Sequence, residues 1–120
     1  MKLFTKTVRL PIRKNPVRIA FSLAKYPNGN TAIHVYRPIL FGYRYWDTIT
    51  VNTAVVYPAN CACIDTNQHG HELVFSLKKQ NLATQIGMCN VSNFCKCPVF
   101  QFDLEKFQQY CISNNALIHA

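Results

Sequence analysis

Two pairs of cysteines have a spacing that suits metal chemistry. Cys61-Ala62-Cys63 and Cys95-Lys96-Cys97 each place two thiols two residues apart. If the two segments form neighbouring strands, four thiolates approach the tetrahedral arrangement of a structural zinc site. Residues i and i+2 of a strand also share one face, so each pair fits small side chains packed into a core, the usual behaviour of buried cysteine. We favour core packing and keep zinc bound by these four cysteines as the alternative.

Two histidines and a further cysteine offer other chemistry. His69 and His71 follow the first cysteine pair closely enough for a Cys2His2 zinc site, although the same residues fit an exposed turn before a helix. Cys95 with one of these histidines and Asp65 contains the parts of a nucleophilic group, but no spacing ties them together. None of the common hydrolase, metalloprotease or nucleotide-binding motifs is present. The sequence therefore predicts a protein that is not an enzyme.

The elements expected to position these side chains are mostly strands. Asn28-Gly29 predicts a tight hairpin turn, and the run that follows it is rich in β-branched residues. We expect residues 37–42 to interrupt the next strand, because Pro38 has no N–H to donate to a sheet. Alternating apolar and polar residues and β-rich composition predict strands over residues 3–10, 17–23, 31–36, 43–53, 61–65 and 98–102.

Helical spacing is confined to the second half of the chain. Leu73 and Leu77 lie four residues apart and predict a short helix within residues 71–81. Asp103 is the expected N-cap of a second helix, while residues 84–93 have little periodicity and are predicted to form a loop. Together these elements predict an α+β fold, in which an antiparallel sheet of about five strands is covered by two short helices.

Composition predicts one ordered domain. The chain has 120 residues, of which 49% are hydrophobic and 15% charged, a balance typical of a globular protein with a core of useful size. Lys6 and Arg9 interrupt the apolar positions that a signal peptide would need, and no stretch is apolar enough for a membrane span. We therefore expect a cytoplasmic protein that makes no membrane contact and whose six cysteines are free thiols.

Positive charge is segregated along the chain. The formal net charge is +8, and residues 1–46 carry nine basic groups with no Asp or Glu, whereas residues 47–120 carry four basic and five acidic groups. This distribution favours an acidic partner and excludes mimicry of nucleic-acid phosphates. Interleaved basic and aromatic side chains suit either stacked bases or a protein hot spot. The expected contact residues are Arg13, Lys14, Arg18, Lys25, Arg37, Tyr43, Arg44, Tyr45 and Trp46.

Several short motifs, in order, carry a family resemblance over roughly residues 26–107. They are Asn28-Gly29 with Thr31-Ala32-Ile33, Thr50-Val51-Asn52, residues 61–67, Lys79-Gln80-Asn81-Leu82 with Gly87, and Phe94-Cys95 leading into residues 98–104. With these the chain resembles a family of small uncharacterised proteins carried by bacterial conjugative elements and phages. It departs from that family where residues 37–46 and 73–79 replace acidic segments, and the family lacks His69 and His71.

The resemblance implies an accessory protein of a mobile element in the cytoplasm of a bacterial host, and it carries over no catalytic residue. We therefore expect a non-enzymatic inhibitor of a host nucleic-acid defence effector, of the anti-CRISPR or anti-restriction kind. Its partner would be the effector protein or the ribonucleoprotein complex that contains it. The alternative is a small DNA- or RNA-binding accessory protein, and a lower one is a zinc-stabilised structural module.

Overall fold

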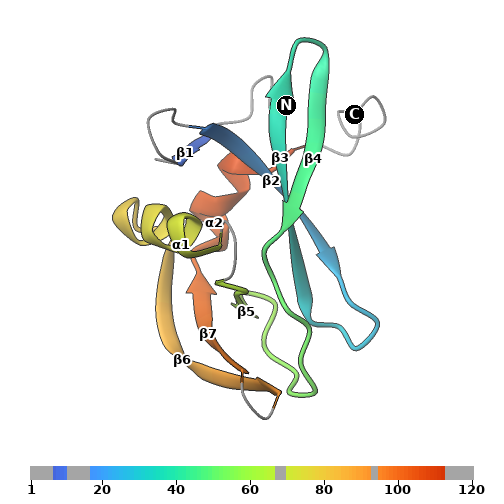
Figure 1. Cartoon of the computed structure of the whole chain (residues 1–120), viewed down its shortest axis with the longest axis vertical. Helices are drawn as coiled ribbons and strands as arrows, with labels where there is room; N and C mark the ends of the chain where they lie inside the picture. The colour runs from blue at the N-terminus through green and yellow to red at the C-terminus, as the bar shows by residue number, and fades with distance from the viewer. Residues whose placement is uncertain (1–6, 11–16, 67–69, 93–94, 113–120) are drawn as a thin grey trace.

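The computed structural model describes residues 7–10, 17–66, 70–92 and 95–112, which form two antiparallel sheets (Figure 1). The larger sheet has four strands in the order β1 (Val8–Leu10), β2 (Val17–Lys25), β3 (Thr31–Ile39) and β4 (Gly42–Thr48). The smaller sheet has three, in the order β5 (Cys61–Cys63), β7 (Cys95–Phe102) and β6 (Ala83–Ser92).

The prediction of a single sheet of about five strands covered by helices is therefore wrong. The described chain is mostly β, and its strands divide between two sheets because residues 53–60 leave the first sheet before Cys61 begins the second. The predicted loop over residues 84–93 is also wrong, since most of it belongs to β6. The strand predicted over residues 43–53 ends earlier, because β4 stops at Thr48. Beyond it, Thr50 forms one isolated bridge, to Ile64.

The β2–β3 hairpin turns where the sequence predicts it. Gly29 has a φ of 91°, and the Gly29 N–H donates to the Tyr26 carbonyl at 2.9 Å. Asn30 follows the turn and is buried, and its side chain is tied to the segment after Thr50. Its Nδ2 donates to Val55 O at 2.9 Å and to Asn52 Oδ1 at 3.1 Å, and its Oδ1 accepts from Tyr57 N at 2.8 Å. The hairpin thus anchors the connection between the sheets.

The helices are short and bounded by local hydrogen bonds. Helix α1 (Gly70–Lys79) is followed by Asn81, whose φ of 58° lets the Leu82 N–H reach the Leu77 carbonyl at 2.9 Å and so stops the helix. Asp103 is the N-cap of α2 (Leu104–Phe107) as predicted, and its carboxylate accepts from Lys106 N at 3.2 Å. A 3-10 turn, η1 (Gln108–Tyr110), continues α2. No helix in the described ranges has the length and apolar character to cross a membrane.

One apolar core joins the two sheets. Phe107 of α2 is fully buried, with its ring 4.7 Å from that of Phe21 in the larger sheet and 5.2 Å from that of Phe102 in the smaller one. Leu73 and Leu77 of α1 pack into the same core. Helix α2 therefore lies between the two sheets, whereas α1 packs at the edge of the molecule beside β1 and the end of β6 (Figure 1).

Candidate functional site

The β3–β4 hairpin projects from one end of the molecule (Figure 1). β2 pairs with β3 only as far as the Ala20–Tyr36 pair, and its first residues pair with β1 instead. From Tyr36 outward the hairpin is consequently a two-stranded ribbon. We call residues 36–45 the arm. Pro38 is tolerated in it because it lies beyond the last β2 partner, where β3 needs no donor on that side.

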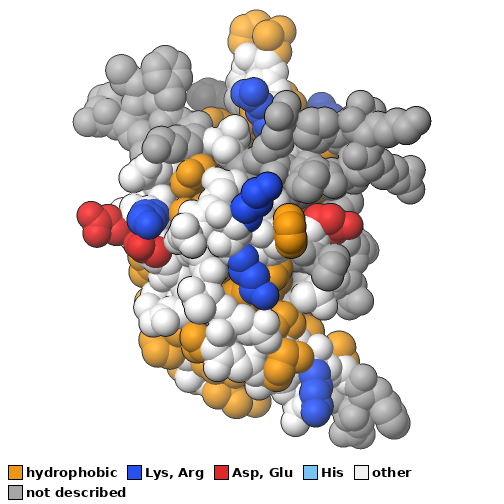
Figure 2. Space-filling view, turned by 90° about the vertical axis from the view of Figure 1, so that its left-hand side faces the viewer, with side chains coloured by type: hydrophobic (Ala, Val, Ile, Leu, Met, Phe, Trp, Pro, Cys, Tyr) orange, Lys and Arg blue, Asp and Glu red, His pale blue; other side chains and the backbone are white. Residues whose placement is uncertain are grey.

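The end of the arm is apolar. Ile39 pairs with Gly42, so Leu40 and Phe41 form the turn, with 88% and 85% of their surfaces exposed. Gly42, the residue after the turn, has a φ of 150°, a backbone conformation that favours glycine. The two turn positions themselves do not need glycine, so Leu40 and Phe41 can occupy them. Figure 2 shows hydrophobic side chains at this extremity with basic side chains below them. We call Leu40 and Phe41 the tip.

Two arginines face each other behind the tip. Arg37 and Arg44 are directly opposite in the register, and both are exposed. Like charges directly opposite on one face of a sheet destabilise the pair. No described residue gives either guanidinium a hydrogen bond or an ion pair. The arm therefore carries a doubled positive charge that an external anion can compensate.

The other face of the arm is aromatic. Tyr36 pairs with Tyr45, and their ring centroids are 5.8 Å apart at an interplanar angle of 81°. The His34 ring lies 6.1 Å from that of Tyr45. Thr48 Oγ1 holds both, at 2.7 Å from His34 Nδ1 and 2.6 Å from Tyr45 OH. Because these rings meet edge to face, the aromatic residues pack on one another rather than forming a flat platform for bases.

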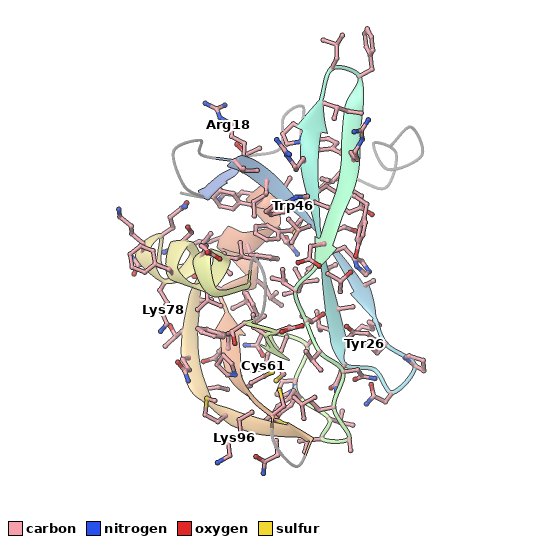
Figure 3. All side chains as sticks on the ribbon, in the orientation of Figure 1. Arg18, Tyr26, Trp46, Cys61, Lys78 and Lys96 are labelled. Carbon is pink, nitrogen blue, oxygen red and sulfur yellow. The ribbon has the colours of Figure 1, made fainter. Side chains whose placement is uncertain are left out.

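A β-bulge separates the aromatic residues of β4. The β3–β4 register shifts between Val35 and Tyr36, which leaves Trp46 between the pairs Tyr36–Tyr45 and Val35–Asp47. Trp46 is partly buried and packs against the main core, and Figure 3 shows it directed from β4 toward the body of the protein. The structure therefore places Trp46 at the root of the arm and not on its outer surface.

The remaining predicted contact residues do not join the arm. Arg18 and Lys25 are both exposed but lie at opposite ends of β2, seven residues apart and so about 23 Å along the strand. Figure 3 shows Arg18 on the side of the molecule away from the β2–β3 turn. Arg13 and Lys14 lie outside the described residues. Of the predicted surface, the structure brings together Arg37, Tyr43, Arg44 and Tyr45.

The cysteines gather on the smaller sheet. Cys61, Cys63 and Cys97 are buried, whereas Cys95 is partly exposed. Burial and neighbouring thiols raise the pKa of Cys63 to about 12, and burial raises the pKa of Cys61 and Cys97. With pKa values raised in this way, these thiols are neutral side chains at pH 7 in the structure.

The zinc site proposed for Cys61, Cys63, Cys95 and Cys97 has no support in this geometry. Within the part of the chain that the structure describes, no three His, Cys, Asp or Glu side chains are placed to hold a metal ion. His69 and the side chain of His71 lie outside the described part of the chain. The Cys2His2 site and the nucleophilic group that need them therefore stay predictions from sequence.

The tip residues were not among the predicted contacts. Residues 37–42 were expected to break a strand, although Leu40-Phe41 is flanked by Arg37 and Arg44, each three residues away. That symmetry is the signal that indicates a hairpin with an apolar turn. A proline within a β-rich segment usually indicates that the strand ends there. Pro38 therefore led to the prediction of a break, and the hairpin was missed.

Comparison with known proteins gives one match. A family described as a domain of unknown function, DUF4313, matches residues 20–118. No curated protein and no solved structure matches the chain. The match includes both sheets, both helices and the arm, but it begins after β1 and the first residues of β2.

Proposed function

This chain belongs to the DUF4313 family, and on that premise we propose that it is a non-enzymatic accessory protein of a bacterial mobile element. It binds and inhibits a host nucleic-acid defence effector of the anti-CRISPR or anti-restriction kind. The support is the resemblance given above together with the arm, which presents apolar and cationic groups to a partner. The effector itself, alone or within its ribonucleoprotein complex, is the partner.

The observation that carries this proposal is the exposed tip. Leu40 and Phe41 are 88% and 85% exposed at the end of a projecting ribbon, where neither contributes to the core. Burying a large apolar side chain fully in a partner is worth about 1.5–3 kcal/mol. Aromatic and aliphatic anchors of this kind dominate protein interfaces when they enter a pocket. The tip therefore suits an apolar recess on a protein.

The arginine pair defines the surroundings of that recess. Arg37 and Arg44 repel each other in the free protein, so a carboxylate of the partner relieves this repulsion as it binds. A basic arm cannot imitate the phosphates of nucleic acid. Inhibition accordingly works by occupying an acidic surface that the effector needs for its conformational change or for its own partners.

The test uses the purified chain as bait. The wild-type chain, the double variant Leu40→Ser/Phe41→Ser and the control Ile86→Ser/Met88→Ser are immobilised and exposed to nuclease-treated lysate from bacteria with CRISPR and restriction effectors. Ile86 and Met88 are 52% and 55% exposed on β6, far from the arm, so the control removes exposed apolar side chains elsewhere.

We expect the wild type and the control to capture an effector and to inhibit its nuclease activity. The tip variant loses the burial of two side chains, about 3–6 kcal/mol, and should therefore lose about 100- to 10,000-fold in affinity. The proposal fails if no effector is captured or if both variants lose capture equally. It also fails if the captured effector keeps full activity.

The second candidate is binding of nucleic acid, which the arm favours because Tyr45 is exposed on one of its faces and Arg37 and Arg44 on the other. Aromatic rings can stack bases, and guanidinium groups can meet phosphates. The edge-to-face packing of Tyr36 on Tyr45 argues against a longer platform. The two candidates differ in salt dependence. Affinity for unrelated DNA or RNA that falls steeply with salt, measured without any effector, supports the second candidate.

A further inference from the structure

Most of the cysteines lie on one face of the smaller sheet, away from the arm. In the register Cys63 faces Val99 and Cys89 faces Cys97. Alternate residues of a strand share a face, so these four side chains point to one side of the sheet. Cys61 and Cys95, two residues away from Cys63 and Cys97, point to the same side. The opposite side carries the aromatic core. The face formed in this way, which we call the thiol face, carries Cys61, Cys63, Cys89, Cys95 and Cys97.

The thiols of this face contact one another. The Cys63 Sγ donates to the Cys97 carbonyl at 3.6 Å. Cys63, Cys89 and Cys97 pack with Val99 in one buried cluster, and Cys95 packs against this cluster. Figure 3 shows sulfur atoms near Cys61 in the lower part of the molecule. All of these cysteines are free thiols in the structure.

Strand geometry selects one pair for covalent linkage. A disulfide requires Cα atoms about 4.4–6.8 Å apart, and directly opposed residues of an antiparallel pair lie about 4.5–5.5 Å apart. Cys89 and Cys97 meet this condition. Cys63 is diagonal to Cys97, at about 7–8 Å, and β7 separates it from Cys89 by two strand spacings, about 9.5 Å.

We propose that Cys89 and Cys97 are an oxidisable pair that forms a reversible cross-strand disulfide by exchange with a low-molecular-weight disulfide. Cys89 and Cys97 are only 6% and 3% exposed, so the exchange begins at the partly exposed Cys95, which packs against their cluster and lies two residues from Cys97 on β7. The pair lies on the thiol face, and its oxidation leaves the arm unmodified.

The chemistry balances in three exchanges. The Cys95 thiolate attacks the small disulfide and expels one small thiolate. The Cys97 thiolate then attacks the Cys95 sulfur and expels the second small thiolate. Cys95 and Cys97 are two residues apart on one strand, about 6.6 Å, so their bond is strained and readily exchanged. The Cys89 thiolate attacks the Cys97 sulfur and frees Cys95. Two protein thiols are oxidised, and their protons leave on two small thiols.

The test incubates the folded wild-type chain with oxidised glutathione, with reduced glutathione as the control. Free thiols are then alkylated in denaturant and the protein is cut with trypsin. Cleavage after Lys79, Lys96 and Lys106 puts Cys97 on residues 97–106, and Cys89 and Cys95 together on residues 80–96. The same mapping is repeated on Cys95→Ser, in which only Cys89 can link residues 80–96 to residues 97–106.

We expect a linkage of residues 80–96 to residues 97–106, with the loss of two hydrogen atoms, in both the wild type and Cys95→Ser. Formation should be several-fold slower in Cys95→Ser, and an unchanged rate would overturn the role of Cys95 as entry point. Linkage of residues 80–96 or 97–106 to residues 45–78, which contain Cys61 and Cys63, would overturn the proposed pairing. A chain that stays reduced, or that carries only glutathione adducts, would also overturn it. The wild type shows whether β6 and β7 become linked, and Cys95→Ser assigns the linkage to Cys89.

Discussion

Asn30 offers the sharpest test of how the two sheets are held together. The side chain is 6% exposed. Its Nδ2 donates to Val55 O at 2.9 Å and to Asn52 Oδ1 at 3.1 Å, and its Oδ1 accepts from the Tyr57 N–H at 2.8 Å. The Nδ2 also donates to Thr53 O at 3.4 Å. The variant Asn30→Ala removes all four bonds while it leaves the hairpin turn in place. The connection between β4 and β5 then loses most of its side-chain hydrogen bonds to the hairpin but keeps that of Thr31 Oγ1 to Ala59 O at 2.9 Å.

The expected cost follows from the number of bonds. Each net hydrogen bond contributes about 0.5–1.5 kcal/mol, and a buried group left without its partner costs about 1–3 kcal/mol. Four bonds, one of them long and several partly at the edge of solvent, therefore predict a loss of about 2–4 kcal/mol in the free energy of unfolding. Asn28→Ala is the control. Asn28 is exposed, its Nδ2 donates to Thr53 O at 2.9 Å and its Oδ1 accepts from the Asn30 N–H at 3.2 Å. Two bonds at an exposed side chain lie at the low end of the range, so the replacement should cost about 1 kcal/mol.

Unfolding in urea, followed by fluorescence under reducing conditions, measures both variants. Trp46 is the sole tryptophan of the chain and packs against the core, so its emission reports on the folded packing. The midpoint should fall clearly for Asn30→Ala and slightly for Asn28→Ala, with an unchanged slope. Equal losses in the two variants, or a loss below about 1 kcal/mol for Asn30→Ala, would refute the reasoning that Asn30 fastens the connection.

Three further predictions concern the helix cap, the buried thiols and the arm. Asp103→Ala should lower the free energy of unfolding by about 0.5–2 kcal/mol in the same urea assay, because the Lys106 N–H loses its acceptor, whereas Asp103→Asn should retain most of it. The pKa of Cys63 is raised from 9.0 to about 12 by burial and neighbouring thiols, so the unfolded chain releases this proton first. Stability should consequently fall as the pH rises from 9 toward 12, and a Cys63→Ala variant whose urea midpoint falls as steeply would contradict this. Arg44→Glu replaces repulsion from Arg37 by attraction and should raise stability by about 0.2–1 kcal/mol while it weakens effector binding; a gain in binding would count against an acidic partner.

Local signals in the sequence located the parts of the fold that depend on neighbouring residues. Asn28-Gly29 predicted the β2–β3 turn, where Gly29 takes a positive φ. The spacing of Leu73 and Leu77 predicted α1, and Asp103 predicted the start of α2. In each case the hydrogen bond or apolar spacing that forms the element involves residues only a few positions apart. A short stretch of sequence is therefore enough to predict the element.

Features that depend on distant partners were missed. β6 has no clear alternation because it is an edge strand with two register shifts, at residues 85–87 and 90–92, and much of its surface is exposed. The division into two sheets depends on residues 53–60, which leave the first sheet, and on the pairing of β5 with β7, which is distant in the sequence. No local pattern records either. The direction of Trp46 depends on the bulge in β4, since strict alternation predicts one uniform face.

The arm stands outside the network of contacts that folds the protein. Its outer residues touch neither the joined core nor the connection fastened by Asn30, and Pro38, Leu40 and Phe41 are all exposed. Sequence change in residues 37–44 therefore has little effect on folding and a direct effect on recognition. A family built on this scaffold can follow a changing target by altering its tip, and the same ribbon is the natural place to graft a new binding sequence.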